Sequence, residues 1–596
     1  MRYFLSLLVS AIYFSSLASC ATHVFDFNIT WVTVNPDGLA ERQVVGINGQ
    51  WPLPVIEVNK GDQIIANVHN GLGDKNTSIH WHGMFMNGTN EMDGASMVTQ
   101  CPIGPGSDFT YNFTVNQNGT YWYHCHVDFC YPDGYRQALI VHDPDAYFND
   151  MYAEEFTVTL SDWYHELEVD IEPTFLSLYN PLGAEPLPQS FLFNDTQNTK
   201  ISVQPNTTYM LRIINIGAFV AQYFYIQDHT FQIIEVDGVY TEPTEADTLY
   251  IGVAQRYTIL FTTKNSTDQN YPIVTVADAV LLDTIPSNLQ LNLTNWLEYN
   301  PDAVFAQADI TVSSCTDLVP FDDATLVPYD HMPLLPDPDQ IIEVTVVMDP
   351  LDNGKPYALL TNISYTKPKV PSLYTVLSSG NDSTDATIYG EFTHPFVLNH
   401  NSVIEIRLNN NDTGSHPFHL HGHNFQVLTR EPPLGADFYD YADLANPVNF
   451  DPNNHTDYPE YPIRRDTLVL PPQGYWVARF VADNPGTWLF HCHIDWHMDQ
   501  GLAAVLIEAP TQLQSLTLPA DHLAACKAVG VQSAGNAAGN DEQFTDLAGQ
   551  NTQPGFQPQG FTPRGEVAMA FAIISALCGI VAIAVYGASG IDLKKK

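Results

Sequence analysis

Basic residues are scarce in this chain of 596 residues, which has 22 Lys and Arg residues against 67 Asp and Glu residues. The resulting formal charge of −45 excludes nucleic acid as a partner, because a phosphate backbone would be repelled. Charged residues of both signs make up only 15% of the sequence. We interpret most of the carboxylates as groups that keep the protein soluble, with attraction of a cationic substrate as a second role for some of them.

Two apolar segments stand at the ends of the chain, and the first begins after Arg2. It continues to Phe14 and is followed by small residues up to Ala21. Because it is too short to span a bilayer, it predicts a secretory signal peptide over residues 1–21. More than ten Asn-x-Ser/Thr sequons favour a glycosylating secretory pathway over a bacterial lipoprotein, including those at Asn28, Asn112, Asn194, Asn265 and Asn362.

The second apolar segment, residues 567–588, is long enough to cross a bilayer. Lys594, Lys595 and Lys596 follow it, which predicts a cytosolic tail over residues 589–596 and a large domain on the other side. The Gln/Gly/Pro/Asn-rich stretch before it, about residues 529–562, is typical of a disordered linker. We therefore assign residues 511–566 to a tail and linker and expect a single-pass membrane anchor.

Many short runs alternate apolar and polar residues, as in Phe109, Tyr111, Phe113 and Val115. This period of two predicts antiparallel strands. Proline and glycine are frequent, and regularly spaced turn signals favour sandwiches or barrels. The fold is therefore expected to be mostly β.

Two segments far apart in the chain resemble each other: GTYWYHCHVDF at residues 119–129 and GTWLFHCHIDW at residues 486–496. Each follows a His-x-His pair upstream, the first at His80 and the second at His419. The repeat predicts a duplicated β-sandwich unit near each end, with a middle domain that lacks these motifs. Linker-like runs near residue 145 and over residues 310–340 give three domains, at residues 22–145, 146–310 and 335–510.

The His-x-His pairs predict a metal site. Residues i and i+2 of a strand face the same side, so each pair projects two imidazoles towards one point. Ordinary core or surface histidines are the alternative for a single pair. Four pairs at matched positions of two repeats are typical of metal ligation instead. The pairs are His80 with His82, His124 with His126, His419 with His421, and His491 with His493.

Cys492 narrows the choice of metal, because it lies between His491 and His493. His497 follows five residues later and His416 precedes it. Two histidines and one cysteine with a weak or absent fourth ligand form the trigonal arrangement of blue copper. Leu502 falls at the expected axial position and cannot coordinate, which should raise the reduction potential.

The alternation of residues 491–493 also predicts how the sites are connected. Cys492 points one way and its two neighbours point the other. A copper on Cys492 would thus be joined through two short covalent paths to whatever His491 and His493 bind. We expect a one-electron acceptor next to a multi-metal cluster that lies between the first and last domains. Electrons would accumulate in this cluster until dioxygen is reduced by four electrons.

The motifs resemble those of the multicopper oxidases, the family of laccases, ascorbate oxidases and ferroxidases. The matching segments are HWHG from His80, HPFHLHGH from His416 and HCHIDWHMDQGL from His491, and similarity extends over most of residues 25–508. The resemblance implies an all-β fold of three cupredoxin-like Greek-key β-sandwich domains, followed by the single transmembrane helix. It also implies four copper ions: one type 1, one type 2 and two type 3.

The resemblance assigns ligands to each copper. The type 1 copper would be held by His416, Cys492 and His497, and the type 2 copper by His80 and His419. The type 3 pair would be held by His82, His124, His126, His421, His491 and His493. Asp93 and Asp495 resemble the acids beside the cluster that supply protons to oxygen. The alternative for these two residues is an ordinary loop carboxylate.

Cys125 departs from the family pattern, which usually has serine at this position. A second type 1 site is not expected, because Cys130 stands where the His497 equivalent would be and Thr77 stands where the His416 equivalent would be. A Cys125–Cys130 disulfide and a pair of buried thiols both remain open.

The remaining cysteines have separate interpretations. Cys101 and Cys526 resemble the disulfide that tethers the tail to the first domain in this family. Cys20 is expected to leave with the signal peptide, and Cys578 lies in the membrane span. Cys315 has no evident partner, unless Cys130 takes that role.

Three acidic residues indicate the electron donor: Glu185 in GAEPLP, Asp283 in LLDTIPSNLQLN and Asp412 in NDTGSHPFHLH. Their segments resemble loops of fungal plasma-membrane ferroxidases, where such carboxylates bind iron and couple it to the type 1 histidines. Hard oxygen ligands suit iron. Asp278 is a weaker candidate on the same loop as Asp283, and solvated loop carboxylates are the alternative for each residue alone.

The resemblance thus implies a cell-surface enzyme that oxidises Fe(II) with O2 and supports high-affinity iron uptake. It further implies that Fe(III) passes to a multi-span iron permease of the same membrane, which is expected to be the plasma membrane, with the vacuolar membrane as the alternative. A membrane-anchored laccase-like phenol oxidase is the second hypothesis, disfavoured by the three carboxylates and the anchor. A copper-storage or assembly module is the third, disfavoured by the complete set of ten histidines.

Overall fold

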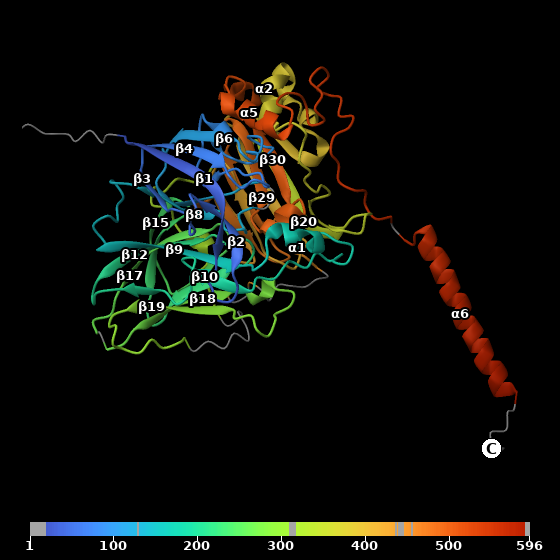
Figure 1. The fold of residues 1–596 in the computed structure, drawn as a ribbon, viewed down its shortest axis with the longest axis horizontal. Coiled ribbons are helices and arrows are strands. Elements are labelled where there is room, and N and C mark those ends of the chain that lie inside the picture. The colour runs from blue at the N-terminus through green and yellow to red at the C-terminus, as the bar shows by residue number, and fades with distance from the viewer. Residues whose placement is uncertain are drawn as a thin grey trace, which may run out of the picture.

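A computed structural model describes residues 20–127, 130–266, 268–308, 318–435, 438, 446–454, 457–558 and 560–589. Nearly all of the predicted signal peptide, Cys315 and the three C-terminal lysines lie outside the described residues. The described part consists of three pairs of β-sheets, a short helical tail and one isolated helix (Figure 1).

The first pair of sheets is built from residues 22–142. One sheet has the order β2-β1-β4-β6 and contains β1 (Thr22–Val34), β2 (Arg42–Ile47), β4 (Gln63–Asn70) and β6 (Asp108–Thr114). The other has the order β3-β8-β7-β5 and contains β3 (Ile56–Asn59), β5 (His80–His82), β7 (Gly119–His124) and β8 (Arg136–His142). The indole of Trp81 on β5 lies with its centroid 5.7 Å from that of Tyr111 on β6, so the core lies between the two sheets.

The second pair is built from residues 154–298. One sheet has the order β10-β9-β12-β17-β14-β15, with β9 (Glu154–Trp163), β10 (Ser190–Phe193), β12 (Thr208–Asn215), β14 (Phe231–Val236), β15 (Val239–Ala246) and β17 (Arg256–Thr262). The other has the order β11-β19-β18-β13-β16, with β11 (Lys200–Ser202), β13 (Gln222–Ile226), β16 (Thr248–Ile251), β18 (Tyr271–Ala277) and β19 (Asn292–Glu298).

The third pair is built from residues 340–508. One sheet has the order β21-β20-β23-β28-β25-β26, with β20 (Gln340–Pro350), β21 (Pro356–Leu360), β23 (Val403–Asn410), β25 (Phe425–Glu431), β26 (Arg464–Arg465) and β28 (Tyr475–Val481). The other has the order β22-β30-β29-β24-β27, with β22 (Pro395–Leu398), β24 (His416–Leu420), β27 (Thr467–Leu470), β29 (Gly486–Cys492) and β30 (Ala503–Glu508).

The three sheet pairs share a pattern that confirms the all-β prediction and refines it. The middle pair has a six-stranded and a five-stranded sheet, as the third pair has, although its sequence lacks the histidine motifs, whereas both sheets of the first pair have four strands. The sheets are mixed rather than purely antiparallel, because each contains a parallel pair such as β1 with β4 or β22 with β30. The predicted alternation on β6 is confirmed, since Phe109, Tyr111 and Phe113 are buried while their neighbours are not. The exact domain boundaries stay predictions.

Short helices decorate the sheets. The α-helices are α1 (Glu168–Phe175), α2 (Ser372–Ser379), α3 (Asp495–Asp499), α4 (Pro510–Leu513) and α5 (Ala520–Val529). The 3-10 helices are η1 (Asn90–Met92), η2 (Ala279–Leu281), η4 (Asp323–Thr325), η5 (Gly380–Thr384), η6 (Ala386–Tyr389) and η7 (Glu391–Thr393). The predicted disulfide between Cys101 and Cys526 is present and fastens α5 to the first pair of sheets.

The stretch after α5 is not the free linker that its composition predicts. Asn536 is fully buried, and its side-chain amide donates to the carbonyls of Phe544 and Asp546. Lys369 N donates to Ala537 O at 2.9 Å, and Gln553 donates to Asn362 O at 3.2 Å. Asn and Gln side chains therefore satisfy backbone groups and fasten residues 530–557, here called the strap, along the third pair of sheets.

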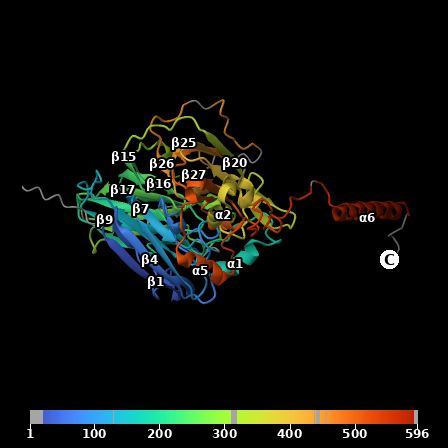
Figure 2. The same ribbon diagram turned by 90° about the horizontal axis from the view of Figure 1, so that it is seen from above.

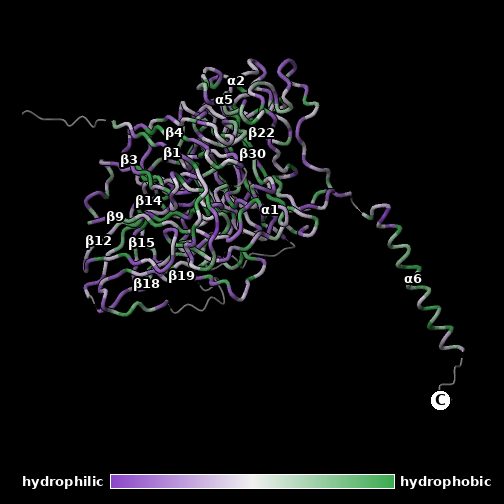
Figure 3. The backbone as a smooth tube through the Cα atoms, viewed as in Figure 1, coloured by the Kyte–Doolittle hydropathy of each residue, from purple (hydrophilic) through white to green (hydrophobic). Residues whose placement is uncertain are grey.

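The last helix, α6 (Pro563–Ala588), is a candidate membrane span with a mean hydropathy of 2.6 over its most apolar window. It extends away from the body in both ribbon views, and none of that window is buried (Figures 1 and 2). Its apolar character continues along most of its length (Figure 3). The helix therefore coincides with the predicted span at residues 567–588.

Candidate metal centre

The eight histidines of the His-x-His pairs lie on two pairs of neighbouring strands or directly after them, with His126, His421 and His493 just beyond the strand ends. In the first domain, β5 pairs with β7 so that His80 lies opposite His124. In the third domain, β24 pairs with β29 so that His419 lies opposite His491. Each strand pair presents its imidazoles on one face, and the two faces meet between the first and third domains.

Close ring contacts across this boundary join the two domains. The ring centroids of His80 and His421 are 3.9 Å apart, and those of His82 and His419 are 3.8 Å apart. His421 Nε2 lies 3.2 Å from His491 Nε2. Three groups of histidines can each offer nitrogens within 4.8 Å of one another: His80 with His82 and His124, His80 with His419 and His421, and His126 with His421 and His491.

The chemistry of these imidazoles fits metal ligation. Within the described residues, several ring nitrogens are buried without a hydrogen-bond partner, which costs free energy unless a ligand is bound. They include His80 Nε2, His82 Nδ1, His124 Nε2, His419 Nε2 and both nitrogens of His493. Burial also lowers the pKa of most of these rings, that of His421 to about 3. The rings with a lowered pKa are therefore neutral, which is the form that binds metals.

A second group lies on the opposite side of β29. Cys492 Sγ is 3.5 Å from His497 Nδ1 and 3.8 Å from His416 Nδ1, and all three residues are buried. Although burial opposes it, hydrogen bonding to the two imidazoles lowers the pKa of the Cys492 thiol to about 7. Leu502 is fully buried, and its carbonyl accepts from the Cys492 N–H. The structure thus brings together the two histidines and the cysteine that the sequence assigns to one site.

The predicted alternation along β29 is visible in these contacts. Cys492 belongs to the group with His416 and His497, whereas His491 belongs to the group with His126 and His421. His493 lies beside His82 and His124, with ring centroids 5.0 and 5.3 Å away. The single strand β29 thus carries residues of both groups, and covalent bonds of its chain join Cys492 to His491.

Two of the three predicted iron-binding carboxylates contact the Cys492 group directly. Glu185 Oε1 lies 2.7 Å from His497 Nε2, and Asp412 Oδ2 lies 3.1 Å from His416 Nε2. Burial opposes ionisation of Asp412, but the hydrogen bond to His416, the charge of that ring and the hydrogen bond from the Gly414 N–H together lower the pKa of Asp412 to about 2. Both carboxylates therefore approach the outward nitrogens of the two imidazoles.

Asp283 completes an acidic cluster around these histidines. Its side chain is exposed, and its pKa is raised by partial burial and by the charges of Glu185 and Asp412. Asp278, the weaker candidate on the same loop, is fully buried and accepts from the Tyr250 hydroxyl at 2.8 Å. This hydrogen bond fixes the loop that carries Asp278. It directs the Asp278 carboxylate to Tyr250 and not to the acidic cluster.

Asp93 and Asp495 lie at the histidine cluster, but in different environments. Asp93 Oδ2 is 2.9 Å from His421 Nδ1, and Asp93 Oδ1 is 3.4 Å from His80 Nδ1. Although burial opposes it, His421 and His80 hold the pKa of Asp93 below its ordinary range. Asp495 is buried beside other acids, and burial raises its pKa well above the ordinary value. One carboxyl is thus a fixed anion and the other retains a proton.

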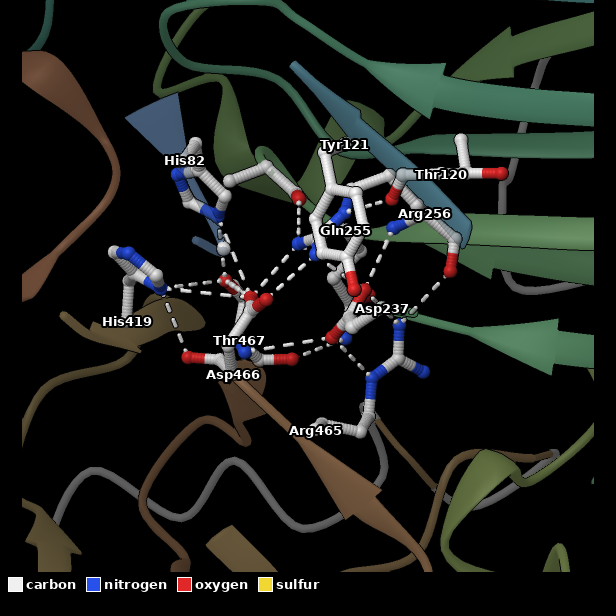
Figure 4. A network of polar contacts seen from close by, with 12 residues as sticks. His82, Thr120, Tyr121, Asp237, Gln255, Arg256, His419, Arg465, Asp466 and Thr467 are labelled. Atoms are coloured by element: carbon white, nitrogen blue, oxygen red, sulfur yellow. Dashed lines mark hydrogen bonds and ion pairs between the residues drawn. The ribbon is translucent and has the colours of Figure 1, made fainter. Parts of the chain in front are cut away.

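Asp466 is a residue of the site that the sequence did not indicate (Figure 4). Its Oδ1 lies 3.3 Å from His82 Nε2, and its backbone carbonyl lies 2.9 Å from His419 Nδ1. The Arg256 guanidinium from β17 donates to both carboxylate oxygens at 2.7 and 2.5 Å. Asp237 accepts a hydrogen bond from the Arg465 side chain. Because Asp237 lies between β14 and β15, the network extends from the histidine cluster into the middle pair of sheets.

Comparison with known proteins decides the family. Three family models described as "Multicopper oxidase" match residues 28–146, 154–302 and 365–512.

The chain belongs to the multicopper oxidase family.

Two similar multicopper oxidases are fungal proteins named for iron transport. The iron transport multicopper oxidase fetC of Epichloe festucae is 51% identical over 574 residues, which cover 96% of this chain and 90% of the relative. The iron transport multicopper oxidase FET3 of Saccharomyces cerevisiae is 50% identical over 576 residues, covering 96% and 89%.

Solved multicopper oxidase structures share the fold. The crystal structure of Fet3p, described as a multicopper oxidase that functions in iron import, has a TM-score of 0.86 and 47% sequence identity, covering 90% of this chain and 100% of Fet3p. The laccase from Botrytis aclada has a TM-score of 0.73 and 28% identity, covering 86% and 92%. Family membership implies copper cofactors, and the neutral, unpartnered imidazoles and the Cys492 group fit them.

A cavity of about 520 Å³ reaches the histidine cluster of this multicopper oxidase. Its lining includes His124, His493 and Asp495, together with Tyr131 and Glu168. One carboxylate oxygen of Asp495 is buried without a hydrogen-bond partner among the described residues. The cavity gives a small molecule access to the side of the cluster that carries the protonated acid.

The cysteine that departs from the multicopper oxidase pattern is in a disulfide. The structure joins Cys125 to Cys130, which decides between the two alternatives left open by the sequence. The hydroxyl of Thr77 lies 3.7 Å from Cys125 Sγ, at the place that a type 1 histidine would need. The prediction that the first domain lacks a second type 1 site agrees with this arrangement.

Proposed function

We propose that this multicopper oxidase is a membrane-anchored ferroxidase. It oxidises Fe(II) to Fe(III), reduces O2 to water with four electrons and supports high-affinity iron uptake. The observation that carries the proposal is the pair of carboxylates, Glu185 and Asp412, hydrogen-bonded to the outward nitrogens of His497 and His416. Relatives named for iron transport, about half identical over nearly the whole chain, support it.

The proposal includes one type 1, one type 2 and two type 3 copper ions with the ligands that the family pattern assigns. His416, Cys492 and His497 hold the type 1 ion, and His80 and His419 hold the type 2 ion. The six remaining histidines of the pairs hold the type 3 ions: His82, His124, His126, His421, His491 and His493. Copper ions bound there would supply the one-electron redox chemistry that the four-electron reduction of dioxygen needs.

The acidic cluster selects the electron donor. Carboxylate oxygens are hard ligands, so Glu185, Asp412 and Asp283 bind Fe(II) and favour the Fe(III) product. Glu185 and Asp412 hold the substrate at hydrogen-bonding reach of His497 and His416. The same hydrogen bonds fix the orientation of both imidazole rings. Binding and orientation thus come from the same two residues.

Asp93 and Asp495 divide the proton chemistry. Asp93 stays ionised and fixes the His421 ring through the contact with Nδ1. Asp495 carries a proton next to the cavity that reaches His124 and His493, so it supplies that proton to reduced oxygen. The fixed anion and the protonated acid have separate roles because their environments move their pKa values apart.

Helix α6 anchors the enzyme in the membrane, with the catalytic domains outside and the C-terminus in the cytosol. The secretory signal, the sequons and the terminal lysines support this orientation and a plasma-membrane location, with the vacuolar membrane as the alternative. A multi-span iron permease of the same membrane receives the Fe(III). A phenol oxidase would need an apolar donor pocket where this chain has three carboxylates.

Oxygen consumption by the purified, copper-loaded protein tests the proposal. We expect the kcat/KM for Fe(II) to exceed that for a methoxyphenol by at least a hundredfold. A protein that consumes oxygen only with the phenol would be the laccase-like alternative. A protein that binds copper but consumes no oxygen with either donor would be the storage alternative.

A further inference from the structure

The strap ends beside the turn between β20 and β21, residues 351–356. Asp352 N donates to Gly555 O at 2.8 Å, and the side chain of Gln557 donates to Leu351 O at 3.2 Å. These hydrogen bonds therefore fasten the chain to the body as far as residue 557. Five residues, 558–562, connect that point to Pro563, where α6 begins.

This short connection limits how far the body can lie from the bilayer. Residues 558–562 reach at most about 18 Å when fully extended, at roughly 3.5 Å per residue. The first turn of α6 is polar and adds about 6 Å, at 1.5 Å per residue. The turn at residues 351–356 thus lies within about 24 Å of the hydrocarbon, so this side of the molecule faces the membrane. Both ribbon views place α1 and β20 on the side of the body nearer to α6 (Figures 1 and 2).

An uncharged loop packs against the same turn. Residues 177–183 follow α1, and a Cβ added at Gly354 would lie 2.8 Å from Leu178 Cδ2. At the other end of the loop, a Cβ added at Gly183 would lie 3.1 Å from Pro356 Cβ. The loop therefore belongs to the face that the strap brings to the membrane.

The loop exposes large apolar side chains on that face. Leu178 is 61% exposed, Tyr179 97% and Leu182 89%. Three such side chains within five residues are unusual on a protein with a formal charge of −45. Phe556 and Phe561, on either side of the end of the strap, are also exposed. A tyrosine and two leucines next to a membrane anchor are typical of the interface between water and lipid.

We propose that Leu178, Tyr179 and Leu182 insert into the interfacial layer of the bilayer and fix the orientation of the enzyme on the membrane. The inference rests on the proposed anchor α6. Lipid is the occupant that fits, because the loop carries no charge and continues the surface that the strap already places at the bilayer. Glu185 follows Leu182 by three residues, so the iron-binding cluster is held towards the membrane. Fe(III) formed there is released beside the bilayer.

The test uses the full chain in phosphatidylcholine vesicles that contain no other protein. A single reactive cysteine is introduced by Tyr179→Cys in a Cys315→Ala/Cys578→Ala background and labelled with an environment-sensitive fluorophore. Val24→Cys is the matched control, because Val24 is 57% exposed and belongs to β1, a strand that begins on the side of the body away from α6 (Figure 1). We expect lipids spin-labelled near the headgroup to quench the label at position 179 at least threefold more than the label at position 24.

A second set of variants distinguishes insertion of the loop into the bilayer from a position that is merely close to the bilayer surface. A label introduced by Leu182→Cys should lose most of its quenching when Leu178→Ser and Tyr179→Ser are added, while Fe(II) oxidation in detergent stays unchanged. Equal quenching at positions 179 and 24, or quenching at position 182 that the serine changes leave intact, would overturn the proposal. Protein that fails to float with the vesicles would instead refute the anchor, so the two failures are distinguishable.

Discussion

Asp466 shows how a single residue can connect the histidine cluster to a domain that supplies none of its histidines. It contacts His82 and His419 and receives both ends of the Arg256 guanidinium. Although burial opposes it, the charge of Arg256 holds the pKa of Asp466 below its ordinary value. Because both partners are fully buried, removal of one leaves an uncompensated charge in the interior.

Arg256→Met should therefore destabilise the protein by about 3–5 kcal/mol, the cost of breaking a buried ion pair. The measurement is the midpoint of thermal unfolding of the metal-free protein. Arg256→Met/Asp466→Asn should lower the midpoint by less than the sum of the single changes, because the isolated charge is gone. The control is Arg464→Met, which breaks an exposed pair with Asp330 and should cost less than about 1 kcal/mol. Equal effects of Arg256→Met and Arg464→Met would contradict the account.

Glu91 gives the stability a pH dependence. It is buried on η1, and burial raises the pKa of its carboxyl to about 7 from an ordinary value of 4.5. The folded state thus binds the Glu91 proton more tightly than the unfolded state does. The stabilisation that this proton gives to the folded state is fully present below pH 4.5 and is lost as the pH rises through 7. At about 1.4 kcal/mol per pKa unit, the loss is about 3 kcal/mol.

At pH values above 7, Glu91→Gln should accordingly raise the midpoint temperature of unfolding. At pH 4 the same change should leave this temperature nearly unchanged. Scanning calorimetry from pH 4 to 8 measures the difference. The exposed Glu57→Gln should show no such dependence. A Glu91→Gln curve parallel to that of the parent protein would show that the carboxyl is not protonated in the folded state.

The two cysteines in His-Cys-His contexts should behave differently. Cys492→Ser removes the sulfur of the proposed type 1 site and should abolish both the blue absorption and the oxidation of Fe(II). Cys125→Ser/Cys130→Ser removes only a disulfide and should keep the blue absorption and more than about a third of the activity, at a cost in stability of a few kcal/mol. Visible absorption and oxygen uptake are measured on both. Loss of the blue colour in the second variant would contradict the assignment.

Among the elements, the strap is the one whose structure departs furthest from what its composition predicts. Asn536 organises it, because the side-chain amide donates to two carbonyls and its oxygen accepts from the N–H groups of Ala538 and Asn540. The composition of residues 529–562 resembles a linker, since Gln, Gly, Pro and Asn form no apolar pattern. The strap holds to the body through amide hydrogen bonds and through a few apolar contacts, because Val531 and Phe544 pack against the core.

Asn536→Ala should release the strap from the body. Four partly buried hydrogen bonds are lost, so cleavage between residues 530 and 557 by a nonspecific protease should become at least tenfold faster. Mass spectrometry of the fragments locates the cuts. Gln543→Ala, at an exposed position of the same strap, is the control and should leave the rate unchanged. Unchanged cleavage of Asn536→Ala would mean that Asn536 does not organise the strap.

At the scale of the whole molecule, local patterns predicted a mostly β fold and singled out histidines and a cysteine that the structure brings together, while the family resemblance gave the three-domain form. The His-x-His pairs and Cys492 are recognisable because residues two apart on a strand share a face. Asp466 was missed because its contact with His82 spans 384 positions and follows no period. Arg256 was missed for the same reason, as it is a buried residue of the middle domain. Long-range polar contacts of this kind leave no local trace in a single sequence.

The central claim is that the carboxylates of the acidic cluster make this multicopper oxidase an iron enzyme. Its most direct test is the kcat/KM for Fe(II) and for a methoxyphenol in Glu185→Ala/Asp283→Ala/Asp412→Ala. The account predicts a fall of at least a hundredfold for Fe(II), with the blue absorption intact and the value for the phenol unchanged or higher. Fe(II) kinetics that survive the triple change, or a parallel loss with both donors, would contradict it.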